Sequence, residues 1–432
     1  MRRFVLLLLA AGWTAATQAQ ETQTHDVTIE DCYAWTRSNY PLVEQLELIG
    51  RAEAYNLSNA ARGWLPQVGV TAQASYQSDV TRIPLDPARL EPLGIEIPTL
   101  SRDQYNARIE LGQTVWDGGA AAATRKGVGA AAEVERASTE VSLYALRERV
   151  NGLFFGILVA GEQIARLDIL ARDLDTMLSR VEALVEGGLA TGADADAIRV
   201  EQLKAQQQQT QLAATRRAYT AMLSTLTGRA MGPGTRFVTP SPAMPAAGGP
   251  GVAENRPEMA LFDAQIESIQ ARQLRLDAAI SPRVGLFATG GYGRPALDML
   301  ADRFEPYYIV GARLSWNIGG LYTRRNDRRQ IALDRRGVEL RRNAFLVNTN
   351  LDATLRSSDI DRLREQLRFD DQIVALRESV LRSSEAKISN GTLSGSDLAR
   401  DINALEAARQ DKLLHEMELL MAVYNLKFTT NN

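Results

Sequence analysis

The residue types that carry out most protein chemistry are scarce in this chain. Its 432 residues include two histidines, His25 and His415, and a single cysteine, Cys32. These are too few ligands for a His/Cys metal cluster, and a lone cysteine cannot form an intrachain disulfide. A nucleophile with a histidine base would have to use one of two histidines in ordinary contexts. Composition therefore predicts no enzyme: no catalytic residues, no metal site and no cofactor.

The charge balance excludes another class of function. Lys and Arg number 49 against 52 Asp and Glu, for a formal net charge of −3. A nucleic-acid-binding protein needs a dense basic face, so no nucleic-acid partner is expected. Apolar residues make up 45% of the chain, which is enough for a buried core.

Two aspartates, Asp194 and Asp397, follow glycine-containing turns with the same spacing. Gly188 to Asp194 and Gly391 to Asp397 share the spacing Gly-x-x-x-x-x-Asp. A glycine that ends one helix, followed by Ser, Thr or Asp at the start of the next, is ordinary turn chemistry. An Asp in the first turn also interacts favourably with the helix dipole. The two turns therefore predict the tips of two helical hairpins.

Proline positions outline the helices that lead to these tips. No proline occurs between Thr99 and Gly232 or between Tyr307 and Asn432, and proline breaks helix interiors. We expect one long helix from about Gly119 to Val185 and another from about Leu321 to Ser389. At 1.5 Å per residue, such a helix would reach roughly 100 Å.

Apolar residues in both long helices recur at coiled-coil spacing. In the first helix the steps of three and four residues are those of the seam of a coiled coil, and the second helix has a corresponding set. The first seam contains Leu167, Leu170, Leu174, Met177, Val181 and Leu184, and the second contains Ile360, Leu363, Leu367, Ile373, Leu376 and Val380.

Four other segments alternate between apolar and polar residues. They lie at about 67–77, 105–115, 283–292 and 308–316, with Phe287 and Ile309 interrupting the polar faces of the second pair. Period two over about ten residues suits a transmembrane β-strand, but a half-buried soluble sheet shows the same alternation. Four strands cannot close a barrel, and an open edge in lipid would leave backbone N–H and C=O groups without partners. If the strands span a membrane, several chains must pool them.

The N-terminus has the form of a secretory signal peptide. Arg2 and Arg3 precede a short apolar run from Phe4 to Trp13, and a small-residue stretch then predicts cleavage after Ala19. The run is too short to span a bilayer as a helix. The residues around Cys32 do not support lipid anchoring.

The mature chain has two halves with the same order of features. We expect a first helix-strand-strand-helix repeat at 20–232, a Pro/Gly-rich linker at 233–257, and a second repeat at 258–432. A repeat of this size indicates a duplicated module.

In combination, these motifs resemble the TolC-like outer-membrane efflux family, the outer-membrane factors. The matching residues are Leu65-Pro66, Trp116-Asp117-Gly118-Gly119, Trp316 to Gly320, and the two Gly-x-x-x-x-x-Asp turns. The resemblance covers essentially the whole mature chain. It implies a mainly α fold with a membrane β part. Long antiparallel helical hairpins would form a trimeric α-barrel, four strands per chain would contribute to a shared twelve-strand β-barrel, and the linker would be equatorial.

The resemblance also implies a function. The protein would be a passive trimeric export conduit in the bacterial outer membrane that extends into the periplasm. It would belong to a tripartite efflux or type I secretion system and contact outer-membrane lipid. Its protein partners would be a periplasmic adaptor (membrane fusion) protein and an inner-membrane transporter, and no cofactor is implied.

Candidate site residues follow from the resemblance as well. Adaptor-contacting hairpin tips would be formed by Gly188, Leu189, Thr191, Gly192, Gly391, Leu393 and Ser394. A periplasmic gate would use Asp397, Asp401 and Asp194, since a ring of carboxylates at a constriction favours cations; for Asp194 alone, a helix-starting role explains the residue better. The sequence departs from the family in two places. Arg400 stands where a second ring carboxylate is expected, and Leu393 stands where some members have a locking arginine.

The main alternative is a periplasmic coiled-coil adaptor or scaffold that spans no membrane. Such a protein would show one hairpin flanked by compact β-domains. Two equivalent halves with paired alternating strands do not fit that pattern.

Overall fold

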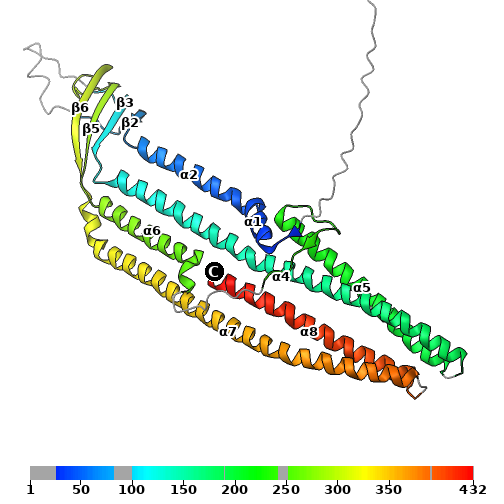
Figure 1. Ribbon diagram of the computed structural model, residues 1–432. Helices are drawn as coiled ribbons and strands as arrows, with labels where there is room; N and C mark the ends of the chain where they lie inside the picture. The colour runs from blue at the N-terminus through cyan, green and yellow to red at the C-terminus, as the bar shows by residue number, and fades with distance from the viewer. Residues whose placement is uncertain (1–25, 82–99, 189, 242–251, 390–391, 432) are drawn as a thin grey trace, which may run out of the picture. The chain divides into compact units, whose positions relative to one another are not determined.

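The computed structural model describes residues 26–81, 100–188, 190–241, 252–389 and 392–431 (Figure 1). The predicted signal peptide at 1–19 lies outside these residues. Both long helices are confirmed, as α4 (Ala120–Glu186) and α7 (Leu321–Ser389). The other helices are α1 (Ile29–Asn39), α2 (Leu42–Arg62), α5 (Gly192–Thr227), α6 (Pro257–Ala279) and α8 (Gly395–Thr430), with 3-10 turns η2 (Val252–Asn255) and η3 (Ile318–Gly320).

Within the described ranges, no helix combines the length and the apolar content needed to cross a lipid bilayer.

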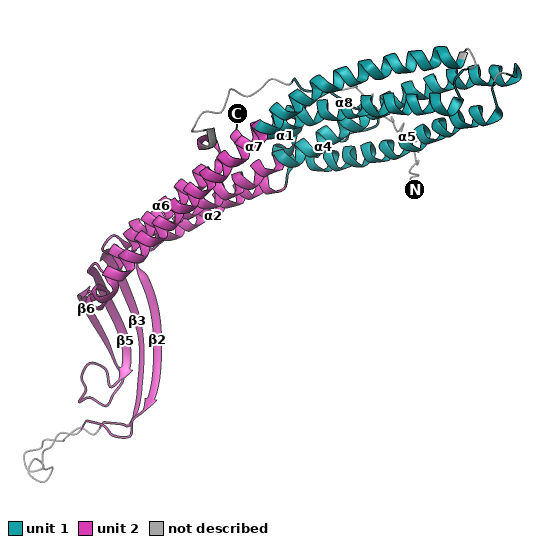
Figure 2. Ribbon diagram, turned by 90° about the horizontal axis from the view of Figure 1, so that it is seen from below, with its two compact units in different colours: residues 1–40, 147–244, 358–425 teal, residues 41–146, 245–357, 426–432 magenta. Residues whose placement is uncertain are grey.

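The chain divides into two compact units, each assembled from separate stretches of sequence (Figure 2). Unit 1 comprises 1–40, 147–244 and 358–425, and unit 2 comprises 41–146, 245–357 and 426–432. Part of the predicted linker at 233–257 belongs to a small parallel sheet in unit 1, where β4 (Arg236–Phe237) pairs with β1 (Asp26–Val27). Residues 242–251 of the linker lie outside the described ranges. The division of the chain into two sequence repeats stays a prediction.

Unit 2 contains a four-stranded antiparallel sheet with the order β2-β3-β5-β6. The strands are β2 (Gln67–Tyr76), β3 (Asp103–Trp116), β5 (Arg283–Arg294) and β6 (Glu305–Ser315), close to the segments that alternation predicts. The pairing of β3 with β5 joins the two halves of the chain in one sheet. Among the described residues, β2 and β6 are edge strands that pair on one side only.

The register places all four apolar runs on one face of this sheet. Val70 lies opposite Ile109, Ile109 opposite Gly290, and Gly290 opposite Tyr308. Residues paired across an antiparallel ladder point to the same side, so the alternation of each strand extends across the sheet. Many of these side chains are exposed, including those of Val70 and Tyr308, which are 76% and 80% accessible. No layer of the described chain covers this apolar face.

The opposite face is mostly polar and has a close cross-strand contact. Asn106 on β3 hydrogen-bonds through its Nδ2 to the Tyr307 hydroxyl on β6, at 2.9 Å. The ring of Tyr307 lies across Gly291 on the intervening β5, where a Cβ would come within 2.3 Å of the ring. Glycine at position 291 is therefore required for the tyrosine to reach its partner.

Unit 1 has two clusters of buried apolar side chains. One contains residues of β1, α1, α4, α5 and α8, with Phe154 and Phe155 at its centre. The other contains residues of α4, α5 and α8, with side chains of α7 packed against it. The first predicted seam is confirmed because Leu167, Leu174 and Val181 are almost wholly buried here. The two hairpins of unit 1 therefore share a core.

The apolar residues of the second long helix fall into two groups that differ in burial. Ile360 and Leu363 are buried, whereas Ile373, Leu376 and Val380 are 46%, 68% and 43% exposed. Heptad spacing identifies residues that share a stripe but not the surface that covers them. In this stretch of α7, the stripe faces away from the rest of the described chain.

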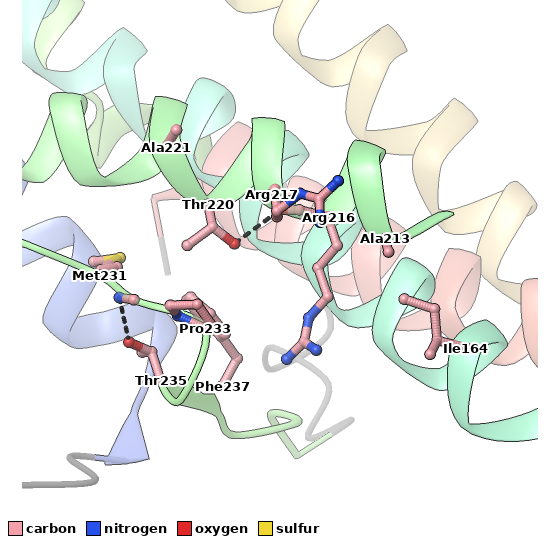
Figure 3. A pocket seen from close by; sticks show the side chains of 11 residues that line it. Ile164, Ala213, Arg216, Arg217, Thr220, Ala221, Met231, Pro233, Thr235 and Phe237 are labelled. Carbon is pink, nitrogen blue, oxygen red and sulfur yellow. Dashed lines mark hydrogen bonds between the residues drawn. The ribbon is translucent and has the colours of Figure 1, made fainter. Parts of the chain in front are cut away.

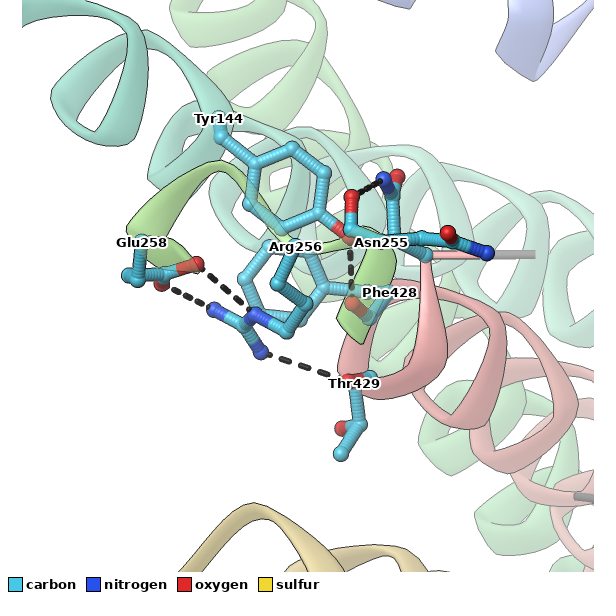
Figure 4. A network of polar contacts seen from close by, with 7 residues as sticks. Tyr144, Asn255, Arg256, Glu258, Phe428 and Thr429 are labelled. Carbon is cyan, nitrogen blue, oxygen red and sulfur yellow. Dashed lines mark hydrogen bonds and ion pairs between the residues drawn. The ribbon is translucent and has the colours of Figure 1, made fainter. Parts of the chain in front are cut away.

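The C-terminal end of the chain is held in unit 2 by a buried arginine (Figure 4). Arg256 forms a bidentate ion pair with Glu258, and both side chains are nearly buried. Its guanidinium lies 5.2 Å from the ring centroid of Tyr144 and 5.2 Å from that of Phe428. It also donates to the Thr429 carbonyl, and the Tyr144 hydroxyl donates to the Phe428 carbonyl at 2.5 Å. The start of α6 is thereby fixed to the last turn of α8.

We predict that Arg256→Met destabilises this contact by about 3–5 kcal/mol, because it leaves the Glu258 carboxylate buried without a partner. Hydrogen-deuterium exchange of residues 421–430 should speed up. The double variant Arg256→Met/Glu258→Leu should recover most of the protection, since no buried charge remains. Equal exchange in the single variant and the unaltered protein would contradict this role.

Candidate functional site at the hairpin tips

The first hairpin tip reverses the chain with a left-handed glycine. Gly188 has φ 73°, a conformation that side-chain-bearing residues rarely adopt, and its N–H donates to the Val185 carbonyl. The next helix, α5, starts at a capping arrangement. The Thr191 hydroxyl and backbone N–H both donate to Oδ2 of Asp194, at 2.7 and 2.9 Å. The helix-starting role of Asp194 is thus present in the structure.

Asp194 also joins the two hairpins of unit 1. Its second oxygen, Oδ1, accepts a hydrogen bond of 2.7 Å from the backbone N–H of Gly395, the first residue of α8. Gly395 is buried, and a Cβ at this position would lie 2.6 Å from the Cβ of Asp194. Glycine therefore allows the two tips to approach closely enough for this bond.

The hydrogen bonds of Asp194 lower the pKa of its carboxyl below the ordinary value. The main cause is the Thr191 hydroxyl, followed by the backbone N–H of the same residue, with the Gly395 N–H adding to the effect. Each of these donors stabilises the ionised form. The carboxyl group is therefore ionised at neutral pH and accepts all three hydrogen bonds as a carboxylate anion.

The second tip has the same kind of capping but a different charge balance. Ser394 Oγ donates to Oδ2 of Asp397 at 2.8 Å. The other carboxylate oxygen forms an ion pair of 3.0 Å with Arg400, one turn further along α8. Arg400, which stands where the resemblance predicts a second ring carboxylate, thus forms an ion pair with Asp397. A favourable pair of opposite charges on one helix replaces two like charges.

Asp401 points toward the neighbouring helix of its own hairpin. Its Oδ2 accepts a hydrogen bond of 2.6 Å from Ser384 on α7, and this contact is partly buried. Two ion pairs link the same helices further from the tip. Arg409 pairs with Glu378 at 2.9 Å, and Lys412 pairs with Asp371 at 2.6 Å. The contacts of Asp401 therefore belong to a polar ladder between α7 and α8.

The other predicted tip residues differ in accessibility. Gly188, Thr191, Gly192 and Ser394 are exposed, while Leu393 is half-buried and packs against the core of unit 1. Leu189 and Gly391 lie outside the described residues. A leucine at position 393 therefore contributes apolar packing to the tip, where some members of the resembled family have a locking arginine.

Sequence reasoning missed two contacts of this region. Gly395 looks like an ordinary turn glycine, and nothing in its local sequence indicates that it meets Asp194. His415 has an ordinary context but contacts the nearly buried Asp370 through its Nδ1, at 2.7 Å from Oδ2. Both contacts join segments that are distant in sequence or on different helices, so no local spacing indicates them.

Within the described ranges, no group of three or more His, Cys, Asp and Glu residues is arranged to hold a metal ion.

Comparison with known proteins identifies the fold. No protein-family signature matches the chain, and no curated protein matches it in sequence. Solved structures do match. One of them is CusC, whose crystal structures concern its folding and the formation of a transmembrane channel. It has TM-score 0.68 at 14% sequence identity, and the match covers 98% of this chain and 95% of CusC.

Two further structures of outer-membrane proteins give the same result. The open state of the MtrE outer membrane channel of Neisseria gonorrhoeae has TM-score 0.68 at 13% identity over 94% of this chain and 89% of its own. The outer membrane protein VceC of Vibrio cholerae has TM-score 0.64 at 11% identity over 94% and 96%. The chain has the fold of these proteins, which confirms the predicted mainly α fold with a β part and, at the level of fold, the predicted resemblance.

We predict that Gly395→Ala separates the two hairpin tips, because the added methyl group collides with Asp194. Spin labels placed at positions 193 and 396 of one chain would report this distance by double electron-electron resonance. The distance should increase and its distribution broaden. Labelled chains are diluted among unlabelled ones so that only distances within a chain are measured. Cys32 is buried, and burial raises the pKa of its thiol to about 12, so it should not take up label. Gly192→Ala is the matched control, since a Cβ there meets nothing within 4 Å. An unchanged distance in Gly395→Ala would contradict the contact.

The same labels should report the pH dependence of the contact. A carboxyl whose folded-state pKa is lowered stabilises the contact at higher pH and loses that contribution as the pH falls through the lowered pKa. The distance should therefore stay constant from neutral pH down to the ordinary Asp value of 3.8 and increase only below it. An increase that is already complete at pH 5 would show that Asp194 does not control it.

Proposed function

We propose that this protein is a passive export channel of the bacterial outer membrane that extends into the periplasm. In this proposal it assembles as a homotrimer and works with a periplasmic adaptor protein and an inner-membrane transporter, in an efflux or type I secretion system. The fold comparisons support a channel, and the proposal includes no catalytic activity. The observation that carries it is the uncovered apolar face of the four-stranded sheet.

This apolar face favours contact with lipid. Apolar residues of all four strands lie on it, and aromatic residues occur toward the ends, at Tyr76, Tyr105 and Tyr308. An exposed contiguous apolar surface marks an interaction site, and aromatic residues are typical of the lipid interfaces of membrane strands. The polar opposite face, with its Asn106–Tyr307 contact, suits a water-filled lumen.

The unpaired edges and the surface of α7 both favour assembly of several copies. In unit 2, the buried Val338 lies on the side of α7 that packs within the chain. Leu340, two residues later, lies about 200° around the helix, and is exposed together with Leu333 and Val347. A helix in a closed ring needs a neighbour on each side. The exposed stripe supplies the second contact surface. In the resembled family the barrel has twelve strands, and with four strands from each chain this number implies a trimer.

The hairpin tips would form the periplasmic mouth. In this proposal, Asp194, Asp397 and Asp401 influence its closure, and the exposed residues Gly188, Thr191, Gly192 and Ser394 contact the adaptor, with Leu189, Gly391 and Leu393 beside them. Closure would rest on the backbone bond from Gly395 to Asp194 rather than on an arginine lock. The Asp397–Arg400 pair would reduce the negative charge of the ring and with it the preference for cations.

A periplasmic adaptor or scaffold remains the second candidate, but the sheet does not favour it. A protein that spans no membrane would expose a broad apolar face to water, which soluble proteins generally avoid. The fold match over 98% of this chain to CusC, whose structures concern transmembrane channel formation, and over 94% to the MtrE outer membrane channel also favours the channel.

The direct test of the proposed function is single-channel recording in a planar lipid bilayer with detergent-purified, full-length protein. We expect discrete conductance steps from an oligomer, and Gly395→Ala should increase the open probability because it separates the tips. Gly192→Ala should behave like the unaltered protein. A purified oligomer that inserts but conducts no ions would refute the channel, and a monomer that is stable without detergent would favour the scaffold.

We also predict opposite tolerances to lysine at two adjacent residues of β2. Val70→Lys places a charge on the apolar face, and a charged residue at mid-membrane costs about 2–4 kcal/mol on the lipid side of a membrane strand. Thr71→Lys places the same charge on the polar face, where water can solvate it. The amount of oligomer in outer-membrane fractions should fall for Val70→Lys and stay near normal for Thr71→Lys. Equal loss in both variants would contradict the assignment of faces.

A further inference from the structure

Unit 1 contains a cavity that none of the preceding functions uses (Figure 3). Its volume is about 460 Å³, within the range of about 300–1,000 Å³ that is usual for small-molecule sites. It lies between α4, α5 and the segment 231–237 that follows α5 and contains β4. A cavity of this size is large enough to hold a small ligand.

One side of the cavity is apolar and firmly supported. Ile164 of α4, Ala213 of α5, and Met231 and Phe237 of the following segment form part of its lining. Met231 and Phe237 also pack against the first core cluster of unit 1, and the ring centroid of Phe237 lies 5.7 Å from that of Phe154. The apolar wall is therefore an extension of the core, and the cavity is formed before any ligand binds.

The other side carries two arginines without an acidic partner. Arg216 is half-buried and Arg217 is exposed, and neither has an ion pair or side-chain hydrogen bond among the described residues. By contrast, Arg199 on the same helix binds both Glu182 and Asp196. A guanidinium beside an apolar wall is stabilised when it finds an anion. The two arginines therefore give this side of the cavity a positive charge, which favours an anionic ligand.

Other polar groups of the lining are already engaged. The Thr220 hydroxyl donates to the Arg216 carbonyl at 2.8 Å, and the Thr235 hydroxyl accepts from the Gly232 N–H at 3.0 Å. The guanidinium N–H groups are thus the charged donors that the lining offers to a ligand, and the Thr235 hydroxyl can add a neutral one.

We propose that this cavity binds a single-chain amphiphile with a carboxylate head group, such as a fatty acid. The carboxylate binds Arg216 and Arg217, whose planar guanidinium groups suit two-point hydrogen bonding to such an anion. The alkyl chain lies against Ile164, Met231 and Phe237. This proposal does not rest on the proposed function.

The test uses a photoreactive fatty acid with a diazirine in a twelve-carbon chain, applied to the purified full-length oligomer in amphipol. The matched probe is the corresponding alcohol, which has the same chain and no charge. After illumination, mass spectrometry of peptides should place the fatty acid on residues of the cavity lining, at Ile164 and within 213–221 and 231–237. The alcohol should label these segments about tenfold less, because it forms no charge-assisted bond.

Two kinds of variant separate the head-group contact from the chain contact. Arg216→Gln/Arg217→Gln should lower fatty-acid labelling to the level of the alcohol and leave alcohol labelling unchanged. Arg172→Gln/Arg180→Gln is the control, since it removes two charges from an exposed part of α4 outside the lining. Ala213→Phe should reduce labelling by both probes, because the larger side chain fills the cavity.

The proposal is overturned if labelling occurs away from the cavity lining, if no labelling occurs, or if the Arg216→Gln/Arg217→Gln protein labels like the unaltered one. Equal labelling by the acid and the alcohol would also overturn it, because the arginines would then make no contribution.

Discussion

The backbone groups along the outer edges of β2 and β6 impose the strongest constraint on this structure. Each edge has about ten residues of strand, and in the described chain the outward-pointing N–H and C=O groups find no partner strand. In water such an edge is tolerated, but in hydrocarbon each unpaired group costs several kcal/mol. The uncovered apolar face favours contact with lipid. The unpaired edges, however, make it too costly in free energy for the sheet of a single chain to lie in lipid. Both conditions are met when copies join edge to edge.

The helices also favour the proposed assembly of several copies. The stripe of α7 that includes Leu376 has the spacing of a packed seam, yet it faces away from the described chain. Sheet edges and helix stripe are thus two surfaces that one chain leaves incomplete. Within unit 1, by contrast, the shared core and the bond between Gly395 and Asp194 hold the two hairpins together. Contacts inside one chain therefore determine the tip geometry, and contacts between copies would determine the pore.

Sequence patterns predicted the positions of the strands and the long helices, which depend on residues close together in the chain. Period-two alternation located the strands to within a few residues, because side chains of a strand alternate between two faces. Proline-free stretches located α4 and α7. The pairing of β3 with β5 and the contact of Asp194 with Gly395 were not predictable, since they join segments far apart in the chain. The seam of α7 was identified as a stripe, but its spacing contained no information about which surface covers Ile373, Leu376 and Val380.

The central claim, that identical copies share their sheet edges, is tested most directly by cross-linking the two edges. Thr71→Cys on β2 and Ile309→Cys on β6 would be combined in one chain and treated in membranes with a short thiol-reactive cross-linker. Native Cys32 is buried and should not react. The account predicts covalent dimers and trimers and no larger species, because the third link closes the ring. Monomers alone, or a ladder that continues beyond trimers, would contradict it.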